Sequence, residues 1–309
     1  MKMSDNAATP QDSMEYWRSD VAKIKEDSIH GSIYLSNQAL DIVEEFVKRR
    51  MYRNRTELIQ ALSKLSNALV RAKPLMALIY NRTRAVLNFI QNIPREQKDI
   101  ELIKLETLQE IERVRQRARE NVKVITRWGG RLILDHHIIL THSASSVVES
   151  ILLSAKQLKR RFRVICTESR PLNEGTQMAI RLAKAGIKVK LVPDADIARA
   201  VNDSHFVLTG TDRFTETTFI NKTGTHAIAT LAHEMNKPLY IAGESEKVLL
   251  KRTYPVRFSQ SNPLELIDKK FDNLQVENIY FEEIPIDYAD KIILEDGVFE
   301  LKEFIDRYL

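Results

Sequence analysis

The sequence has 309 residues, enough for about two domains, and 43% of them are hydrophobic, which excludes a disordered chain. No run of 18 or more apolar residues occurs, and the first residues lack the apolar stretch of a secretory signal. We therefore expect a cytoplasmic protein with no membrane contact. Cys166 is the single cysteine, which rules out an intrachain disulfide and a cysteine-rich zinc site.

Charge and glycine are unevenly distributed along the chain. Residues 1–128 hold 23 Lys and Arg against 17 Asp and Glu, and the remainder is close to neutral. This excess fits a solvated helical surface better than a nucleic-acid site, and we predict no DNA binding. Only Gly31 precedes position 128. Because helix interiors disfavour glycine and strand-to-helix turns use it, we expect a helical domain over 1–128 and another architecture over 129–309.

The first domain is predicted to be helical after about ten loose residues. Apolar side chains recur every three or four positions in four segments, which is typical of helices with one buried face. The segments are residues 33–50, 56–72, the stretch between Pro74 and Pro94, and 105–125. The last is the clearest and predicts a long helix that ends near Trp128, where Gly129 and Gly130 would mark the change of architecture.

The second domain alternates between predicted strands and helices. The predicted strands are residues 138–141, 162–167, 187–192, 206–208 and 239–242. The predicted helices are one from Ser146 through Leu158, then 174–185, a short one from Asp194, and 225–235. Such alternation implies parallel strands with helical crossovers, so the fold class is α/β with a Rossmann-like open sheet. The dinucleotide fingerprint G-x-G-x-x-G is missing, and we predict no nicotinamide or flavin cofactor.

That fold predicts where a ligand would bind, because open α/β sheets bind outside the carboxyl ends of their strands. Four predicted strand ends are polar: Thr141–Ser143, Thr167–Arg170, Asp194 and Gly210–Arg213. The helix starts at Ser143–Ser146 and Asn221–Thr225 could hold a phosphate on their free backbone N–H groups, or could be capped by Ser and Thr. We expect a pocket for a small polar ligand here. The histidines are too sparse for a metal site, and we predict none.

Taken in order, these strings resemble one family. They are Ile139–Ser143, Thr167–Gly175, Gly210–Arg213, Asn221–Thr225 and, near the C-terminus, Tyr280–Pro285. The chain resembles the alpha, beta and delta regulatory subunits of translation initiation factor 2B, which are related to methylthioribose-1-phosphate isomerase and ribose-1,5-bisphosphate isomerase. The likeness covers about residues 20–309. It implies an N-terminal helical domain followed by a Rossmann-like domain, as the residue patterns do.

The resemblance also points to one informative departure. The isomerases carry a cysteine after their Thr-His dipeptide and an aspartate in their Gly-x-Asp-Arg segment. Asp212 matches the aspartate, but Ser143 stands at the cysteine position. A thiol has a pKa of about 8.5 that can be tuned, whereas a serine hydroxyl is a far weaker acid. His142 is not expected to activate Ser143, because neighbouring strand residues point to opposite faces. Cys166 is expected to be a small buried hydrophobe.

Two further family strings depart from the isomerase pattern. Those that face the sugar phosphate in the isomerases, Arg-Gly-Ala and Arg-Pro, correspond here to His30-Gly31-Ser32 and Lys73-Pro74. Glu174 replaces a glutamine, and its carboxylate would repel phosphate. Together these changes favour the initiation-factor branch.

The resemblance therefore implies an archaeal alpha-like regulatory protein that binds a phosphorylated sugar or nucleoside monophosphate without turnover. The expected ligand-binding residues are His30, Gly31, Lys73, Ser143, Arg170, Asp212, Asn221, Lys222 and Lys247. It also implies self-association through the C-terminal domain and contact with the alpha subunit of initiation factor 2. The enzyme alternative is a ribose-1,5-bisphosphate or related sugar-phosphate isomerase, in which Asp212 acts with a replacement for the thiol. A third possibility is a structural subunit with an empty pocket.

Overall fold

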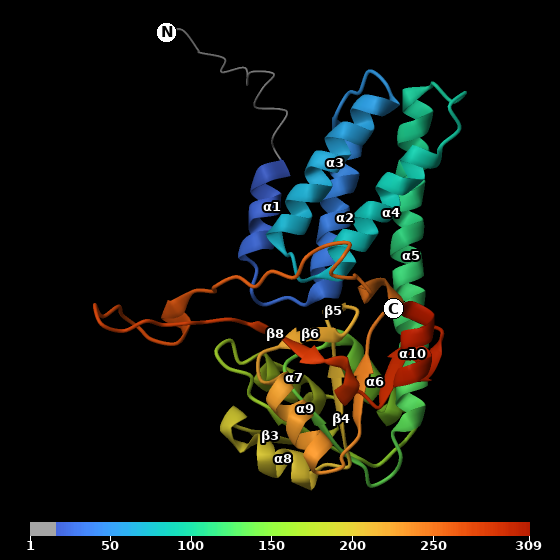
Figure 1. The fold of residues 1–309 in the computed structure, drawn as a ribbon. Coiled ribbons are helices and arrows are strands. Elements are labelled where there is room, and N and C mark those ends of the chain that lie inside the picture. The colour runs from blue at the N-terminus through green and yellow to red at the C-terminus, as the bar shows by residue number, and fades with distance from the viewer. Residues whose placement is uncertain (1–16) are drawn as a thin grey trace, which may run out of the picture. The chain divides into compact units, whose positions relative to one another are not determined.

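The computed structural model describes residues 17–309, so the expectation of loose first residues lies outside the described part of the chain. Residues up to Lys73 and Ile79–Gln116 form one compact unit, and Pro74–Leu78 and Arg117–Leu309 form another. The first unit is helical and the second is α/β (Figure 1). This confirms the predicted fold class.

The first unit is built from amphipathic helices that bury their apolar stripes against one another. Its helices are α1 (Trp17–Glu26), α2 (Ser32–Arg49), α3 (Arg55–Ala72), most of α4 (Ala77–Asn92) and the first half of α5 (Ile100–Leu132). Leu35, Phe46 and Leu58 are among its fully buried residues. Asn54 caps α3 by accepting the backbone N–H of Glu57 at 3.0 Å, which stabilises the helix start. No helix within residues 17–309 is long and apolar enough to cross a membrane.

Helix α5 corrects one expectation from the sequence. It continues through Gly129 and Gly130 to Leu132 and does not end near Trp128. The glycines serve helix packing: a Cβ at Gly129 would lie 2.5 Å from Ile151 Cδ1 in α6 (Ser146–Gln157). The missing side chains let the two helices approach closely, which outweighs the low helix propensity of glycine.

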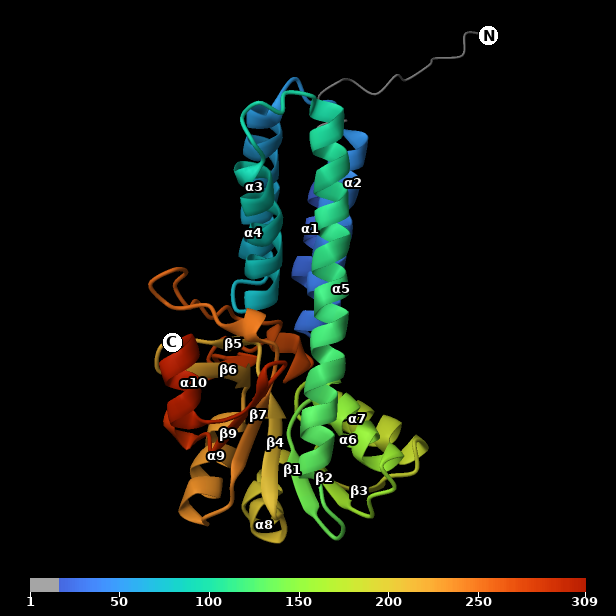
Figure 2. The same cartoon turned by 90° about the vertical axis from the view of Figure 1, so that its right-hand side faces the viewer.

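The second unit contains a seven-stranded sheet in the order β10-β9-β7-β4-β1-β2-β3 (Figure 2). Its strands are β1 (Ile138–Thr141), β2 (Arg163–Thr167), β3 (Lys188–Val192), β4 (Phe206–Gly210), β7 (Leu239–Ala242), β9 (Lys291–Leu294) and β10 (Gly297–Glu300). All neighbours pair in parallel except β9 and β10. The connecting helices are α6, α7 (Glu174–Lys184), α8 (Ile197–Asp203) and α9 (Thr225–Glu234). The carboxyl ends of the six parallel strands, β9, β7, β4, β1, β2 and β3, therefore share one edge.

A small second sheet lies beside that edge and was not predicted. It consists of β5 (Arg213–Phe214), β6 (Thr218–Lys222) and β8 (Phe281–Pro285). Arg213 is fully buried, and its guanidinium donates to the carbonyls of Leu249, Leu250 and Tyr254. These bonds fix the start of residues 251–280, an arm that leaves the α/β unit (Figure 1). The chain ends in α10 (Leu301–Tyr308), whose Phe304 packs on Phe214.

Candidate functional site

The loops after β1 and β2 hold unusual backbone conformations next to each other. Ser143 and Ser169 have φ values of 64° and 62°, in the left-handed region that costs a non-glycine residue about 1 kcal/mol or more. Ser143 N donates to Ser169 Oγ at 2.8 Å. Both carboxylate oxygens of Asp194 accept backbone N–H groups, from Ser169 at 2.8 Å and from Arg170 at 2.7 Å. This network holds both serines at the carboxyl edge of the sheet.

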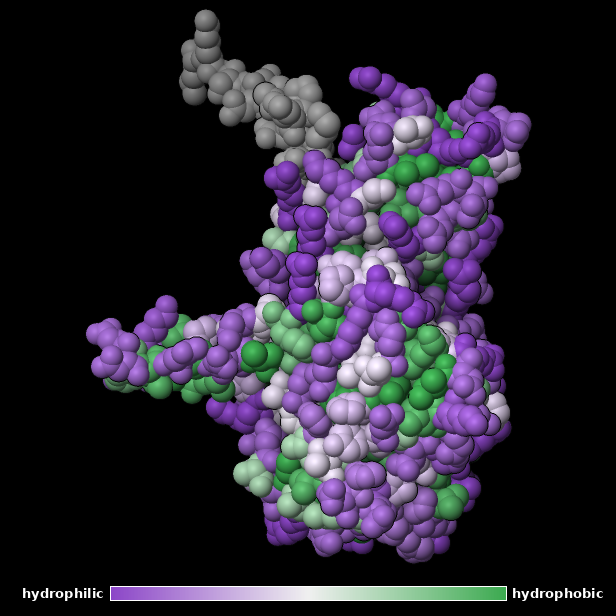
Figure 3. All heavy atoms as spheres, in the orientation of Figure 1, coloured by the Kyte–Doolittle hydropathy of each residue, from purple (hydrophilic) through white to green (hydrophobic). Residues whose placement is uncertain are grey.

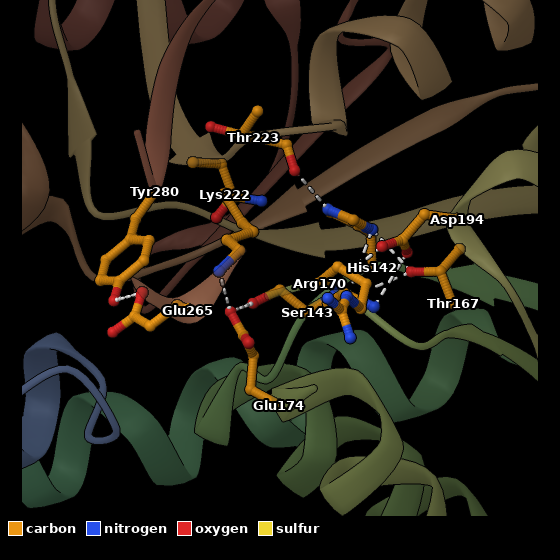
Figure 4. Close-up of polar contacts among 12 residues, drawn as sticks. His142, Ser143, Thr167, Arg170, Glu174, Asp194, Lys222, Thr223, Glu265 and Tyr280 are labelled. Atoms are coloured by element: carbon orange, nitrogen blue, oxygen red, sulfur yellow. Dashed lines mark hydrogen bonds and ion pairs between the residues drawn. The ribbon is translucent and has the colours of Figure 1, made fainter. Parts of the chain in front are cut away.

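Three side chains meet at the centre of the site (Figure 4). Glu174, the first residue of α7, accepts the ammonium of Lys222 at 2.6 Å and the hydroxyl of Ser143 at 3.3 Å, both on Oε1. Lys222 is almost fully buried, at 3% exposure. Its ammonium also lies 4.8 Å from the ring centroid of Tyr280, whose hydroxyl donates to Glu265. Glu174 Oε2 is buried and has no hydrogen-bond partner among residues 17–309.

His142 is turned away from this centre and is engaged on both ring nitrogens. Nε2 lies 2.9 Å from the carbonyl of Thr223, so Nε2 carries the proton, and Nδ1 accepts the Thr167 hydroxyl at 2.6 Å. Burial lowers the pKa of His142 below its usual value of 6.5, which keeps the ring neutral. Gly224, at φ 107°, passes so close that a Cβ there would lie 2.9 Å from Nε2. His142 thus ties the loops together and does not contact Ser143 Oγ.

Side chains of this protein occupy both helix starts that the sequence singled out. Ser145 caps α6 by accepting the backbone N–H of Val148 at 3.4 Å. At α9, one oxygen of Glu282 accepts the backbone N–H groups of Gly224 and His226, each at 2.8 Å. Of the two alternatives, internal capping is the one present, and at α9 the cap is a carboxylate from β8.

Asn221 and Lys247 are buried and bonded to neighbouring groups. Asn221 donates from Nδ2 to the hydroxyls of Thr209 and Thr225, at 2.8 and 3.0 Å. Lys247, in a short 3-10 turn (Ser245–Lys247), donates to the carbonyl of Thr211 at 2.5 Å. Both side chains therefore fix the end of β4 and the turn after it.

The side chains of Arg170 and Asp212 differ from those of Asn221 and Lys247, because no hydrogen bond to a described residue holds them. The guanidinium of Arg170 is exposed, and the carboxylate of Asp212 is half-buried. Within residues 17–309 neither group forms an ion pair or a side-chain hydrogen bond. The backbone of Asp212 is held on both sides, by Ile220 O at 2.9 Å and by Ala77 N at 3.2 Å. Among the expected ligand-binding residues of the α/β unit, Arg170 and Asp212 therefore have charged groups that no described side chain engages.

The three expected residues of the helical unit lie around Asp27. His30 Nδ1 is 2.7 Å from Asp27 Oδ2, and Lys73 donates to the Asp27 carbonyl at 2.5 Å. The His30 ring stacks on Tyr34 with centroids 4.0 Å apart. Gly31 is the N-cap position of α2 and faces open space. The structure thus gathers His30, Gly31 and Lys73 within the first unit.

Sequence reasoning missed three acidic or aromatic side chains at the site. Tyr280 and Glu282 lie in the C-terminal string that carried part of the family resemblance, which was their only signal. Glu265, on the arm, had none. Burial raises the pKa of Cys166 to about 12, which agrees with its expected role as a buried hydrophobe. Within residues 17–309, no group of three or more His, Cys, Asp or Glu side chains could hold a metal ion.

Similarity to known proteins identifies the family of this chain. A model of the family described as "Initiation factor 2 subunit family" matches residues 28–301. The chain belongs to the initiation factor 2 subunit family. A Pyrococcus horikoshii protein described as translation initiation factor eIF-2B subunit 2-like is 30% identical over 89% of this chain and 93% of its own length. A ribose 1,5-bisphosphate isomerase from Methanocaldococcus jannaschii is 27% identical over 92% of both chains.

Solved structures agree on the fold of this family member. The crystal structure of translation initiation factor eIF-2B from Pyrococcus horikoshii matches with a TM-score of 0.79 and 26% identity, covering 94% of this chain and 99% of that one. A chain of the tetrameric eIF2B-beta2-delta2 complex from C. thermophilum matches with a TM-score of 0.74 and 18% identity, covering 94% of this chain and 93% of that one. Family membership leaves regulatory subunits and isomerases as the two classes to distinguish.

Proposed function

We propose that this chain is a non-catalytic, alpha-like regulatory member of its family that binds a phosphorylated sugar or nucleoside monophosphate. The observation that carries the proposal is the state of Ser143. Its hydroxyl donates to Glu174, and that carboxylate is already held by Lys222 at 2.6 Å. A hydroxyl in this position lacks the acidity of a thiol, and the carboxylate oxygen that it contacts is already paired with an ammonium group.

The ligand part of the proposal rests on Arg170 and Asp212. A guanidinium binds phosphate through paired N–H donors, and a carboxylate accepts sugar hydroxyls. We propose that Arg170 contacts the phosphate and Asp212 the sugar. Asn221 and Lys247 shape the floor beside Ser143, and Lys222 joins the phosphate contacts once the ligand competes with Glu174.

Calorimetric titration with AMP, GMP and ribose 5-phosphate tests this pocket. We expect binding by the wild type and a loss of about tenfold or more in affinity for Arg170→Ala and for Asp212→Ala. Arg199→Ala is the matched control, because Arg199 is an exposed arginine of the same unit whose one ion pair among residues 17–309 is with Asp196, three residues before it. The proposal fails if the wild type binds none of the three compounds or if all variants bind equally well.

One observation favours the isomerase as a second candidate. Glu174 places a carboxylate 3.3 Å from Ser143 Oγ, and a carboxylate can move protons between neighbouring carbons as a thiol or thiolate could. With Asp212 it would form the required pair of acid and base. Conversion of ribose 1,5-bisphosphate to the ketose bisphosphate, lost in both Glu174→Gln and Asp212→Asn, would replace the regulatory proposal with this one.

We also propose that the protein acts in the cytoplasm as a homo-oligomer that associates through the α/β unit and contacts the alpha subunit of initiation factor 2. The arm (residues 251–280) supports self-association, because it combines charged and apolar surface (Figure 3). Its large apolar side chains with 38–50% exposure are Phe258, Leu264, Leu266, Phe271, Leu274 and Ile279. Such exposed apolar surface marks interaction sites. Light scattering of the wild type and of a Phe258→Ser/Phe271→Ser variant tests it: we expect the wild type to be at least dimeric and the variant to dissociate.

A further inference from the structure

A second concave site lies at the opposite edge of the large sheet from Ser143. There, the turns before β1, β2 and β3 enclose a cavity of about 370 Å³ (the strand starts are at the lower edge of the sheet in Figure 2). Five of its lining side chains are permanent cations: Lys156, Arg160, Arg161, Arg163 and Lys188. His136 and His137 complete the polar lining, and no Asp or Glu lines the cavity. A cavity of this size suits a small molecule.

The protein itself offsets only part of the positive charge of this cavity, through Asp135, which lies outside the lining and interacts with Arg160 and Arg161. Within residues 17–309, none of the five cations forms an ion pair with a carboxylate. Lys156 donates to the carbonyl of Gly186 at 2.8 Å, and Arg160 Nε is buried with no hydrogen-bond partner in the described chain. Like charges that lie close together repel one another. This repulsion raises the free energy of the folded state, and a bound anion would reduce it.

Hydrogen bonds of the backbone hold the segments that carry these cations next to each other. His136 N donates to the Arg161 carbonyl at 2.6 Å, and Arg163 N donates to the His137 carbonyl at 2.9 Å. Asp135 accepts the backbone N–H of Arg161 at 2.7 Å. That hydrogen bond and the nearby charges of Arg160 and Arg161 hold the pKa of Asp135 below its usual value, as expected in a positive field. The fold therefore fixes the backbone segments from which these side chains extend, so that five cations border one cavity.

We propose that this cavity, the polyphosphate cavity, binds a small molecule that carries two or more linked phosphate groups. Several phosphates are needed to match five cations that converge on one cavity. Single-stranded RNA is the less suitable occupant, because base stacking requires exposed aromatic rings. The one Phe, Tyr or Trp of the lining, Phe162, is 6% exposed. The site is separate from the pocket of Ser143 and Glu174 and does not depend on the function proposed for that pocket.

Titration calorimetry with inorganic tripolyphosphate in low-salt buffer tests the proposal. We expect the wild type to bind and Arg161→Ala/Lys188→Ala to bind at least tenfold more weakly, because both residues are exposed and their loss removes two charges without disturbing the core. Arg95→Ala/Lys98→Ala removes the same charge from an exposed loop of the helical unit and should bind like the wild type. Equal melting temperatures would show that the variants remain folded.

Three results would overturn the proposal. The first is no binding of tripolyphosphate by the wild type. The second is a loss of binding in Lys222→Met with none in Arg161→Ala/Lys188→Ala, which would place the anion in the other pocket. The third is binding of a short single-stranded RNA that depends on Arg161 and Lys188 while tripolyphosphate does not bind, which would assign the cavity to RNA.

Discussion

Replacing Glu174 by glutamine is expected to tighten the binding of a phosphorylated ligand. Oε1 of Glu174 lies 2.6 Å from Lys222 Nζ, so the carboxylate already forms an ion pair with the ammonium group that a phosphate would contact. Glutamine keeps the shape and one oxygen acceptor for Lys222 and Ser143. It removes the negative charge that a phosphate placed beside Lys222 would meet.

The size of the effect follows from Coulomb's law. Two unit charges 4 Å apart interact by about 4 kcal/mol at an effective dielectric constant of about 20. The Glu174 side chain is 19% exposed, so water screens part of this interaction. A gain of roughly 1–2 kcal/mol remains, which corresponds to about 5- to 30-fold in affinity for AMP. The same change leaves the buried Lys222 without its counter-charge, so the free variant should melt a few degrees lower than the wild type.

Calorimetric titration with AMP measures the change in affinity. Glu149→Gln is the matched control, because Glu149 also has a side-chain exposure of 19% and pairs with a cation, Arg181. The reasoning is refuted if Glu174→Gln binds AMP no more tightly than Glu149→Gln does. If neither variant nor the wild type binds AMP or the other phosphate esters, the pocket proposal itself is wrong.

Three further predictions concern the core of the α/β unit. Cys166 should not react with iodoacetamide at pH 8 in the folded protein, because burial raises its pKa to about 12, and should react fully in urea; mass spectrometry measures both. Burial lowers the pKa of His142. Below about pH 6.5 its imidazole therefore binds a proton in the unfolded chain but stays neutral in the folded chain. Stability should thus be complete above pH 6.5 and decrease below it, by up to about 1.4 kcal/mol per pH unit, and urea unfolding of His142→Gln should show a smaller slope. Gly129→Ala should destabilise by about 1–3 kcal/mol despite alanine's better helix propensity, because the new Cβ would lie 2.5 Å from Ile151 Cδ1; an increase in the urea midpoint would contradict this.

Five of the six parallel strands could be predicted, because they are short, largely apolar runs between turn residues; β9 was not predicted. The predicted strand 162–167 matches β2 within one residue, for example. The second small sheet could not be found this way. Strand β5 has only two residues, and β6 ends in Asn221 and Lys222, whose polarity resembles a loop. The two glycines Gly129 and Gly130 led to a wrong end for helix α5 for a related reason. Their role depends on α6, which packs against them, and the local sequence does not reveal that contact.

The edge of the sheet on which polar side chains gather was also predictable, since it follows from topology alone. The pairing of those side chains was not. Glu174 was expected to repel phosphate, but only the fold shows that its partner is Lys222, on a strand that the sequence did not reveal. Asn221 and Lys247, expected to contact ligand, are bonded to the turn around Thr211 and to its neighbours. Long-range contacts of this kind carry no periodic signal.

Three internal carboxylates occupy positions at this edge that favour anions. Asp194 accepts two backbone N–H groups after β2, Glu174 accepts Lys222, and Glu282 accepts two N–H groups at the start of α9. An incoming phosphate must displace one of them or use a cation that none of them holds. Arg170 is such a cation, since its own backbone N–H is bound by Asp194 while its guanidinium is exposed. On the function proposed above, a phosphate ester first contacts Arg170 and then competes with Glu174 for Lys222, which is the order of contacts that the Glu174→Gln experiment tests.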